Sequence, residues 1–271
     1  MRDHVYDQVP FHLSELSHRY GPNVHIVADP FMLTQLATLC AKETIQPEIN
    51  RLVAALYGQL SRQVVSHAFP RVAASVPTRM VDHTPQGVFQ GQVIARDTRV
   101  VVVNIARAGT LPSQVTYDLL NGILDPRGVR QDHIIMSRLL GESEQVVGAG
   151  IGGAKIGGDV DDAMVLIPDP MGATGGSLST AITTYKEKVQ GAARKFVCVN
   201  LIVTPEYLKR ITTDHPDAVV YAVRLDRGLS PPEIFGTVPG THWDRERGLN
   251  ERQYIVPGGG GFGEIMNNAY V

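Results

Sequence analysis

Apolar residues recur every three or four positions between Gln46 and about Phe69, on one face of a predicted helix. They are Ile49, Leu52, Val53, Leu56, Leu60 and Val64. This spacing predicts an amphipathic helix packed against a core, and Pro47 suits its first turn. Residues 1–22 show no such pattern, and we expect a polar arm there that holds at most one short helix.

From residue 88 onward the chain alternates between β-branched runs and helical patterns. Strands are expected at Val88–Ile94, Arg99–Ala106, His133–Arg138, Met164–Asp169, Lys195–Thr204 and Ala218–Leu225. Helices are expected at Leu111–Leu120, Gly175–Val189 and Pro205–Thr213. Several strands are continuous apolar runs, which is typical of strands buried on both faces. The alternation predicts an α/β fold, with a central, mainly parallel sheet and helices on both faces.

Two stretches lack periodicity. Residues 141–162 are rich in glycine and acidic residues and predict a long flexible loop, whereas 226–271 are rich in glycine and proline. Long irregular segments are usually functional or disordered. Since no stretch has the composition of a linker, we expect one domain.

The composition narrows the function classes. Apolar residues make up 43% and charged residues 19% of the chain, so a sizeable core is expected. Lys and Arg number 25 against 27 Asp and Glu, so no basic excess points to nucleic acid. Cys40 and Cys198 belong to no cluster, which argues against a zinc site or disulfide framework. No apolar run approaches the ~18 residues of a membrane span. We therefore expect a cytoplasmic protein without a nucleic-acid or membrane partner.

The sharpest chemical signal is the segment 164–177, which reads MVLIPDPMGATGGS. A buried strand ends at Asp169, a turn of small residues follows, and a helix begins near Gly175. The first N–H groups of a helix lack intrahelical partners and favour an anion, so this pattern predicts a phosphate site. Asp169 stands where ligands bind in α/β sheets, and its carboxylate suits a sugar diol or a magnesium-bound water. The alternative is an ordinary strand–turn–helix with a serine cap.

Two other motifs resemble ligand sites. Residues 148–153 (GAGIGG) match the dinucleotide pattern GxGxxG, but no amphipathic helix follows to bind a pyrophosphate, so we expect a mobile loop. Residues 159–162 (DVDD) are either a cation site or an acidic turn before a strand.

Four collinear segments resemble the uracil phosphoribosyltransferase family. They are PDPMGATGGS at 168–177 for the family's DPMLATGGS, VNIARAG at 103–109 for VPILRAG, Ser137-Arg138 for the YR that begins the hood, and GLNERQYIVPG at 248–258 for GLNEHGYIVPG. Weaker similarity extends the match over about 24–271 and leaves 1–23 as an N-terminal arm.

The resemblance implies a phosphoribosyltransferase fold with a C-terminal hood. It implies transfer of ribose 5-phosphate from phosphoribosyl diphosphate (PRPP) to uracil, giving UMP and pyrophosphate. Mg²⁺ would be bound through PRPP and not by a metal site of the protein itself. The 141–162 loop would close as a lid against water. Self-association is also implied.

The resemblance also implies particular site residues. The PRPP site comprises Arg107, Arg138, Asp169, Pro170, Met171, Gly172, Ala173, Thr174, Gly175, Gly176 and Ser177. Arg107 and Arg138 would clamp the pyrophosphate and Asp169 would bind the ribose hydroxyls, which makes these three the catalytic candidates. The base contacts carried over are Ile255, Gly260, Gly261 and Phe262, largely through backbone groups.

The chain departs from the family at the base segment. The family continues GLGDAGDR, whereas residues 258–265 read GGGGFGEI, so an aspartate falls on Gly261 and an alanine on Phe262. Glu264 stands close enough in sequence to replace the aspartate. Gly172 replaces a leucine, which predicts a more pliable loop. Residues 226–246 resemble an insertion that either reshapes the base pocket or forms an oligomer contact. Three functions stay open: transfer to uracil, transfer to another nitrogen heterocycle, or a non-catalytic regulator that binds PRPP or a nucleotide.

Overall fold

The computed structural model describes residues 4–140 and 146–270, with the side chains of 137–140 and 146–149 left aside. Its centre is a sheet in the order β1-β10-β9-β7-β4-β5-β6, with β8 beside β9. Neighbouring strands are parallel except for β5 and β6, which are antiparallel. The strands are β1 Val24–Ile26, β4 Val100–Ala106, β5 Val129–Leu140, β6 Val146–Lys155, β7 Met164–Pro168, β8 Met171–Gly172, β9 Lys195–Val203 and β10 Val219–Leu225. The predicted α/β class is confirmed.

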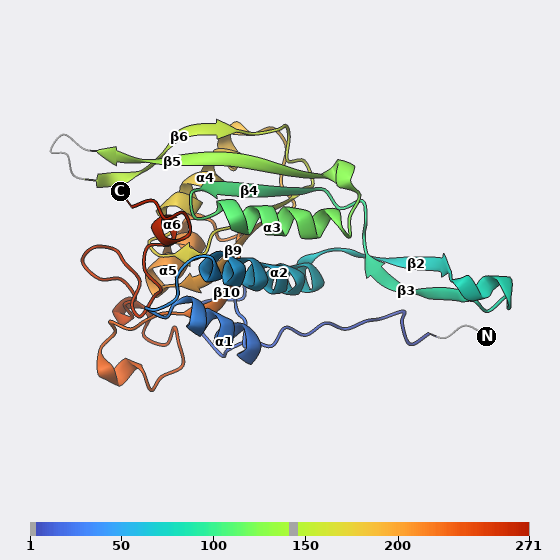
Figure 1. Cartoon of the computed structure of the whole chain (residues 1–271), viewed down its shortest axis with the longest axis horizontal. Helices are drawn as coiled ribbons and strands as arrows, with labels where there is room; N and C mark the ends of the chain where they lie inside the picture. The colour runs from blue at the N-terminus through green and yellow to red at the C-terminus, as the bar shows by residue number, and fades with distance from the viewer. Residues whose placement is uncertain (1–3, 141–145, 271) are drawn as a thin grey trace.

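Helices cover both faces of this sheet (Figure 1). Helices α1 (Pro30–Leu39), α2 (Glu48–Ala68) and α3 (Thr110–Asn121) pack on one face, and α4 (Gly176–Lys188) and α5 (Pro205–Asp214) on the other. Residues alternate between the two cores along each strand, because successive side chains of a strand point to opposite faces. Val102 thus belongs to the core under α2, whereas Val101 belongs to the core under α4.

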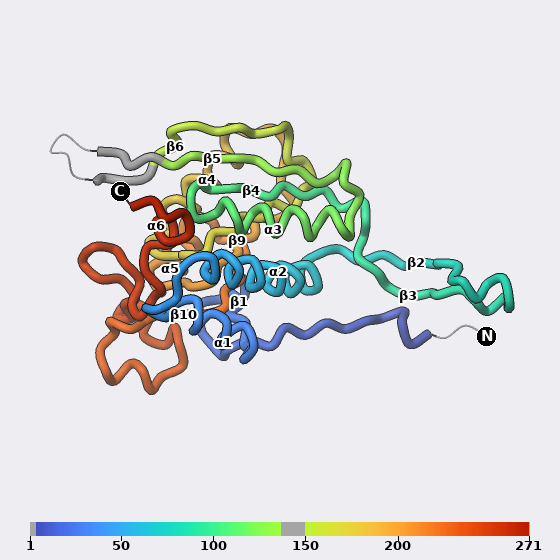
Figure 2. The backbone as a smooth tube through the Cα atoms, viewed as in Figure 1, coloured from blue at the N-terminus to red at the C-terminus, as the bar shows by residue number. Residues whose placement is uncertain are grey.

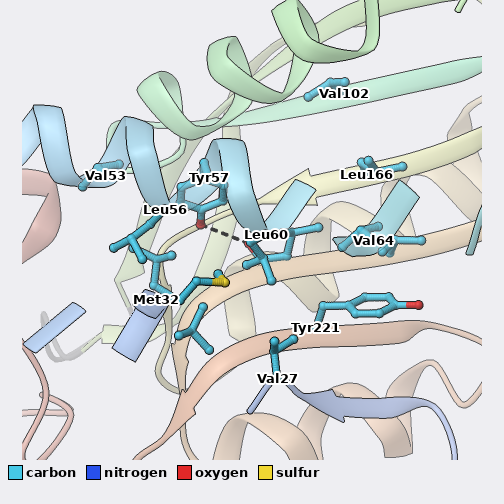
Figure 3. Packing of buried hydrophobic residues seen from close by; sticks show 14 of the residues in the cluster. Val27, Met32, Val53, Leu56, Tyr57, Leu60, Val64, Val102, Leu166 and Tyr221 are labelled. Carbon is cyan, nitrogen blue, oxygen red and sulfur yellow. Dashed lines mark hydrogen bonds between the residues drawn. The ribbon is translucent and has the colours of Figure 1, made fainter. Parts of the chain in front are cut away.

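The helix predicted between Gln46 and about Phe69 is α2, and it packs through the apolar face that the sequence indicates. Leu56, Leu60 and Val64 are fully buried. Figure 3 shows this cluster with Val102 and Leu166 of the sheet. The Tyr57 hydroxyl donates a hydrogen bond of 3.1 Å to the Val199 carbonyl, so α2 is also fixed to β9 by a polar contact.

A two-stranded antiparallel hairpin extends away from the body of the molecule (Figure 2). It pairs β2 (Arg71–Pro77) with the predicted strand β3 (Val88–Ile94), and a short 3-10 turn, η1 (Arg79–Asp82), lies near its tip. The N-terminal segment runs beside the hairpin and accepts a hydrogen bond from Gln92 at the Tyr6 carbonyl. Residues 4–23 contain no helix, so this part of the arm does not hold the one short helix that the sequence allowed.

Part of the flexible loop expected over 141–162 is a strand instead. Residues 146–155 form β6, which pairs with β5, and the GAGIGG motif lies inside this strand. Backbone pairing forms the strand although its glycines give no apolar alternation. Residues 141–145 of the predicted loop lie outside the described part. The acidic turn that follows is tied to arginines: Asp159 lies 3.0 Å from Arg99, and Asp162 lies 2.6 Å from Arg194.

Residues 226–246 carry two 3-10 turns, η3 (Pro232–Ile234) and η4 (Trp243–Arg245). The Trp243 ring lies 4.9 Å from that of Tyr20, and its Nε1 donates to the Pro205 carbonyl at 2.9 Å. This segment therefore joins the N-terminal arm to α5. In the part of the chain that the structure describes, no helix has the length and apolar character needed to cross a bilayer.

Candidate active site

The loop between β7 and α4 has the geometry of a phosphate site. Gly175 adopts a left-handed conformation with φ of +78°, and α4 begins directly after it. No side chain caps this helix. The Gly176 N–H makes only a long hydrogen bond of 3.4 Å to the Thr174 hydroxyl, so the first N–H groups of α4 can turn to an anion. Thr174 is exposed beside them, and Ser177 lies half-buried in the first turn.

Asp169 stands at the start of this loop and is almost fully buried, with an exposed fraction of 9%. Its carboxylate accepts a hydrogen bond of 3.1 Å from the Met171 N–H. Burial raises the pKa of this carboxyl group to about 6, because a charged carboxylate is poorly solvated there. A partner that stabilises the charge, such as hydroxyl groups or a cation, would favour the ionised form.

The loop is held in place from β9 and α5. The Asn200 amide donates to the Asp169 carbonyl at 2.7 Å, and the Tyr207 hydroxyl donates to the Asn200 Oδ1 at 2.8 Å. Thr204 donates to the Ala173 carbonyl at 2.6 Å. These three residues were not predicted from the sequence. Asn200 had a usable signal, since it is a polar residue inside the apolar run FVCVNLIV.

Gly172 allows the loop to pack closely against β9 and α5. The prediction that this glycine makes the loop more pliable is therefore wrong. Its backbone pairs with Val203 in the sheet. A Cβ at Gly172 would lie 2.9 Å from the Val203 side chain and 3.0 Å from the Tyr207 ring. The leucine of the family motif therefore has no room in this packing.

Arg107 follows β4 and meets the C-terminal segment. Its Nη1 donates to the Ala269 carbonyl at 3.0 Å, and its Nη2 lies 3.6 Å from Oε1 of Glu264. The side chain is 40% exposed, so it is accessible to a ligand. Arg138 lies in β5 opposite Ala149, but its side chain is outside the described part, so its role as a clamp stays a prediction.

The turn after β4 rests on the end of β7. A Cβ at Gly109 would lie 3.0 Å from the Pro168 carbonyl oxygen, so only glycine permits this close approach. Arg107 and the phosphate loop therefore belong to adjacent turns at the carboxyl edge of the sheet, where ligands bind in open α/β sheets.

The glycine-rich segment after residue 247 lies at the same edge (Figure 1). The buried Asp226 accepts hydrogen bonds from the Arg224 side chain and from the Gly258 N–H, the latter at 2.8 Å. Arg224 also donates to the Gly258 carbonyl at 2.9 Å. Glu206 accepts from the Gly248 N–H at 3.0 Å. The carboxylates of Glu206 and Asp226 thus fix the two ends of the segment 248–258, which resembles a base site.

The four predicted base contacts differ in exposure. Ile255 and Phe262 are buried and pack with Met266 in the core, so their side chains belong to the interior. Gly260, with φ of +85°, is exposed, and Gly261 is half-buried. Of these four residues, only the two glycines have backbone groups that a ligand can reach from solvent. This is consistent with recognition through backbone groups.

Within residues 4–140 and 146–270, no group of three or more His, Cys, Asp and Glu side chains could hold a metal ion. Asp169 is the only carboxylate of the phosphate loop. A single carboxylate fits magnesium that takes most of its ligands from water and substrate phosphates.

A family model described as uracil phosphoribosyltransferase matches residues 26–245. The uracil phosphoribosyltransferase of Streptococcus mutans is 30% identical over 246 residues, covering 89% of this chain and 96% of that protein. The Dictyoglomus turgidum enzyme of the same name is 27% identical, covering 90% and 98%. The protein belongs to the uracil phosphoribosyltransferase family, as a divergent member.

Among solved structures, the AQ2163 protein of Aquifex aeolicus superposes with a TM-score of 0.69 at 20% identity. The match covers 92% of this chain and 99% of that one. This likeness concerns the fold alone. The family match ends at residue 245, before the glycine-rich segment on which the predicted base contacts lie.

Proposed function

We propose that the protein transfers the ribose 5-phosphate of PRPP to a nitrogen of uracil, releasing pyrophosphate and forming UMP. The observation that carries the proposal is the uncapped start of α4, with the buried Asp169 beside it and Arg107 on the adjacent turn. Membership of the family supports it.

In this proposal the 5-phosphate binds the first N–H groups of α4 and the hydroxyls of Thr174 and Ser177. Asp169 accepts hydrogen bonds from the ribose hydroxyls. Arg107 and Arg138 stabilise the charge that develops on the departing pyrophosphate. The sugar carbon passes through an oxocarbenium-like state, so positioning and electrostatics do the catalytic work and no nucleophilic side chain is needed. Mg²⁺ carried by PRPP would neutralise the pyrophosphate oxygens, and Asp169 is the loop residue that fits it.

Uracil is the base that the names of the relatives indicate, and the backbone of the exposed Gly260 and the half-buried Gly261 suits the edge of a planar ring. A second candidate is the same transfer to another nitrogen heterocycle. It is favoured by Gly261, which lacks the carboxylate that the family motif has at this position.

The test is to incubate the protein with PRPP, Mg²⁺ and a panel of free bases and to follow pyrophosphate release. Turnover with uracil supports the leading proposal. Turnover with another heterocycle alone supports the second candidate. Tight PRPP binding without turnover on any base would overturn both and indicate a non-catalytic, PRPP-binding regulator.

A further inference from the structure

Position 261 has no side chain, and the space beside it is filled by another residue. A Cβ at Gly261 would overlap Oε2 of Glu264 and lie 3.1 Å from its Cδ. The φ of Gly261 is −82°, a conformation that any residue adopts. The backbone would therefore allow a side chain at position 261, but that side chain would displace the Glu264 carboxylate from its observed place.

The same carboxylate reaches Arg107, since its other oxygen lies 3.6 Å from the guanidinium. Position 264 is aspartate in the family motif GLGDAGDR, so Glu264 is one methylene longer. The longer side chain and the missing one at 261 are complementary changes, because the first extends into space that the second leaves free.

The position of Glu264 is set by the core. Short helix α6 (Phe262–Ile265) carries it, and Phe262 is buried. Gln46 donates to the Ile265 and Met266 carbonyls at 3.1 and 3.0 Å, and Asn50 donates to the Met266 carbonyl at 3.1 Å. The carboxylate is therefore held at Arg107 by a helix that is fastened to the start of α2.

We propose that Glu264 is an internal counter-ion of Arg107 that competes with pyrophosphate, a role that rests on the proposed function. In the free protein it holds the guanidinium at the active-site edge together with the Ala269 carbonyl, to which Arg107 donates. Ion pairs that are partly exposed are weak, and this carboxylate is 26% exposed, so a more highly charged anion can displace it. When the transfer is complete, the returning carboxylate favours release of pyrophosphate. Glu264 is a positioning residue, and Gly261 gives it room.

Two single variants test this inference by different physical routes. Glu264→Gln keeps the shape and removes the charge. Gly261→Ala keeps the charge, but its methyl group displaces the carboxylate from Arg107. We expect each to bind pyrophosphate about threefold to tenfold more tightly in calorimetry, because the competing charge is removed or moved away. Both KM for PRPP and kcat should fall, since release becomes slower. Glu187→Gln, which removes an exposed charge on α4, is the matched control and should change neither quantity.

The double variant Gly261→Ala/Glu264→Gln should bind pyrophosphate no more tightly than Glu264→Gln alone, because both changes break one interaction. Unchanged or weaker pyrophosphate binding in both single variants would overturn the inference, and so would fully additive effects. If the wild type does not transfer ribose 5-phosphate but the variants still bind pyrophosphate more tightly, the proposed function fails and the counter-ion inference stands. If the wild type binds no pyrophosphate, both fail.

Discussion

The side-chain amide of Asn200 donates a hydrogen bond of 2.7 Å to the backbone carbonyl of Asp169. Asn200 is fully buried inside β9, and its own Oδ1 accepts a hydrogen bond from Tyr207 on α5. A polar chain therefore runs from α5 through the sheet to the first residue of the phosphate loop. The loop takes its position from the core and not from its own sequence alone.

Replacing Asn200 with Ala should destabilise the protein and loosen this loop. The change leaves the Asp169 carbonyl and the Tyr207 hydroxyl without their partner, which costs roughly 1–3 kcal/mol for each buried group. We expect a lower free energy of unfolding in urea and weaker PRPP binding by calorimetry. Tyr207→Phe removes only one bond and should have the smaller effect on both. Equal PRPP affinity in Asn200→Ala and wild type would show that the loop does not depend on this contact.

Because burial raises the pKa of Asp169, we expect the free energy of unfolding to depend on pH. Its pKa is about 6 in the folded protein and near 4 in an unfolded chain. The folded state therefore holds a proton that the unfolded state has lost between these values. The stability due to the protonated group is fully present below pH 4 and is lost as pH rises through 6. A shift of about two units corresponds to roughly 3 kcal/mol.

Asp169→Asn removes this titration. We expect the variant to unfold at a higher urea concentration than wild type at pH 8, with the difference shrinking towards pH 4. PRPP binding should weaken, because the amide carries no charge for the ribose hydroxyls or the cation. A variant that is stabilised but still binds PRPP normally would show that Asp169 does not contact the ligand. An unchanged pH dependence would contradict the burial argument.

Much of the fold could be predicted because its buried strands carry continuous apolar runs. Strand β4 begins one residue after the predicted Arg99 and ends at the predicted Ala106, and β7 likewise follows its apolar run. Strand β2 was missed because it is mostly exposed and shows no apolar alternation. Strand β6 was missed because its glycines pair with β5 through the backbone alone. Strands formed by backbone pairing leave little trace in the pattern of side chains.

The part of the candidate site that the sequence indicates is the part in which one continuous segment carries all the chemical groups. The phosphate loop is such a segment, because its glycines and hydroxyls follow a buried strand. The contact between Arg107 and Glu264 could not be predicted, since 157 residues separate them and the short helix α6 has no periodic pattern. The burial of Phe262 depends equally on distant partners. Contacts between remote segments follow from the tertiary fold and not from local spacing.

The segment 226–246 is anchored by a buried charge. Glu246 is fully buried, and its carboxylate lies 3.1 Å from the Arg227 guanidinium. The carboxylate also accepts hydrogen bonds from the Gly240 N–H and from the Tyr20 hydroxyl. Glu246→Ala leaves a nearly buried guanidinium without its partner, so we expect a loss of about 3–5 kcal/mol in the free energy of unfolding. Glu233→Ala, at an exposed pair, should change it by less than about 0.5 kcal/mol. Similar unfolding curves for the two variants would contradict this anchoring role.

Arg107 gives the most direct test of where pyrophosphate binds. Arg107→Ala removes a guanidinium that would stabilise charge on the leaving group, and loss of one such donor typically costs about 100-fold or more in kcat. We expect that loss in pyrophosphate-release assays, with a smaller change in KM for PRPP. Arg107→Lys keeps the charge without the planar fork and should be intermediate. Arg127→Ala removes a side chain that is 90% exposed and should leave kcat unchanged. If Arg107→Ala had wild-type kinetics, pyrophosphate would bind elsewhere, and the assignment of the turn after β4 would be wrong.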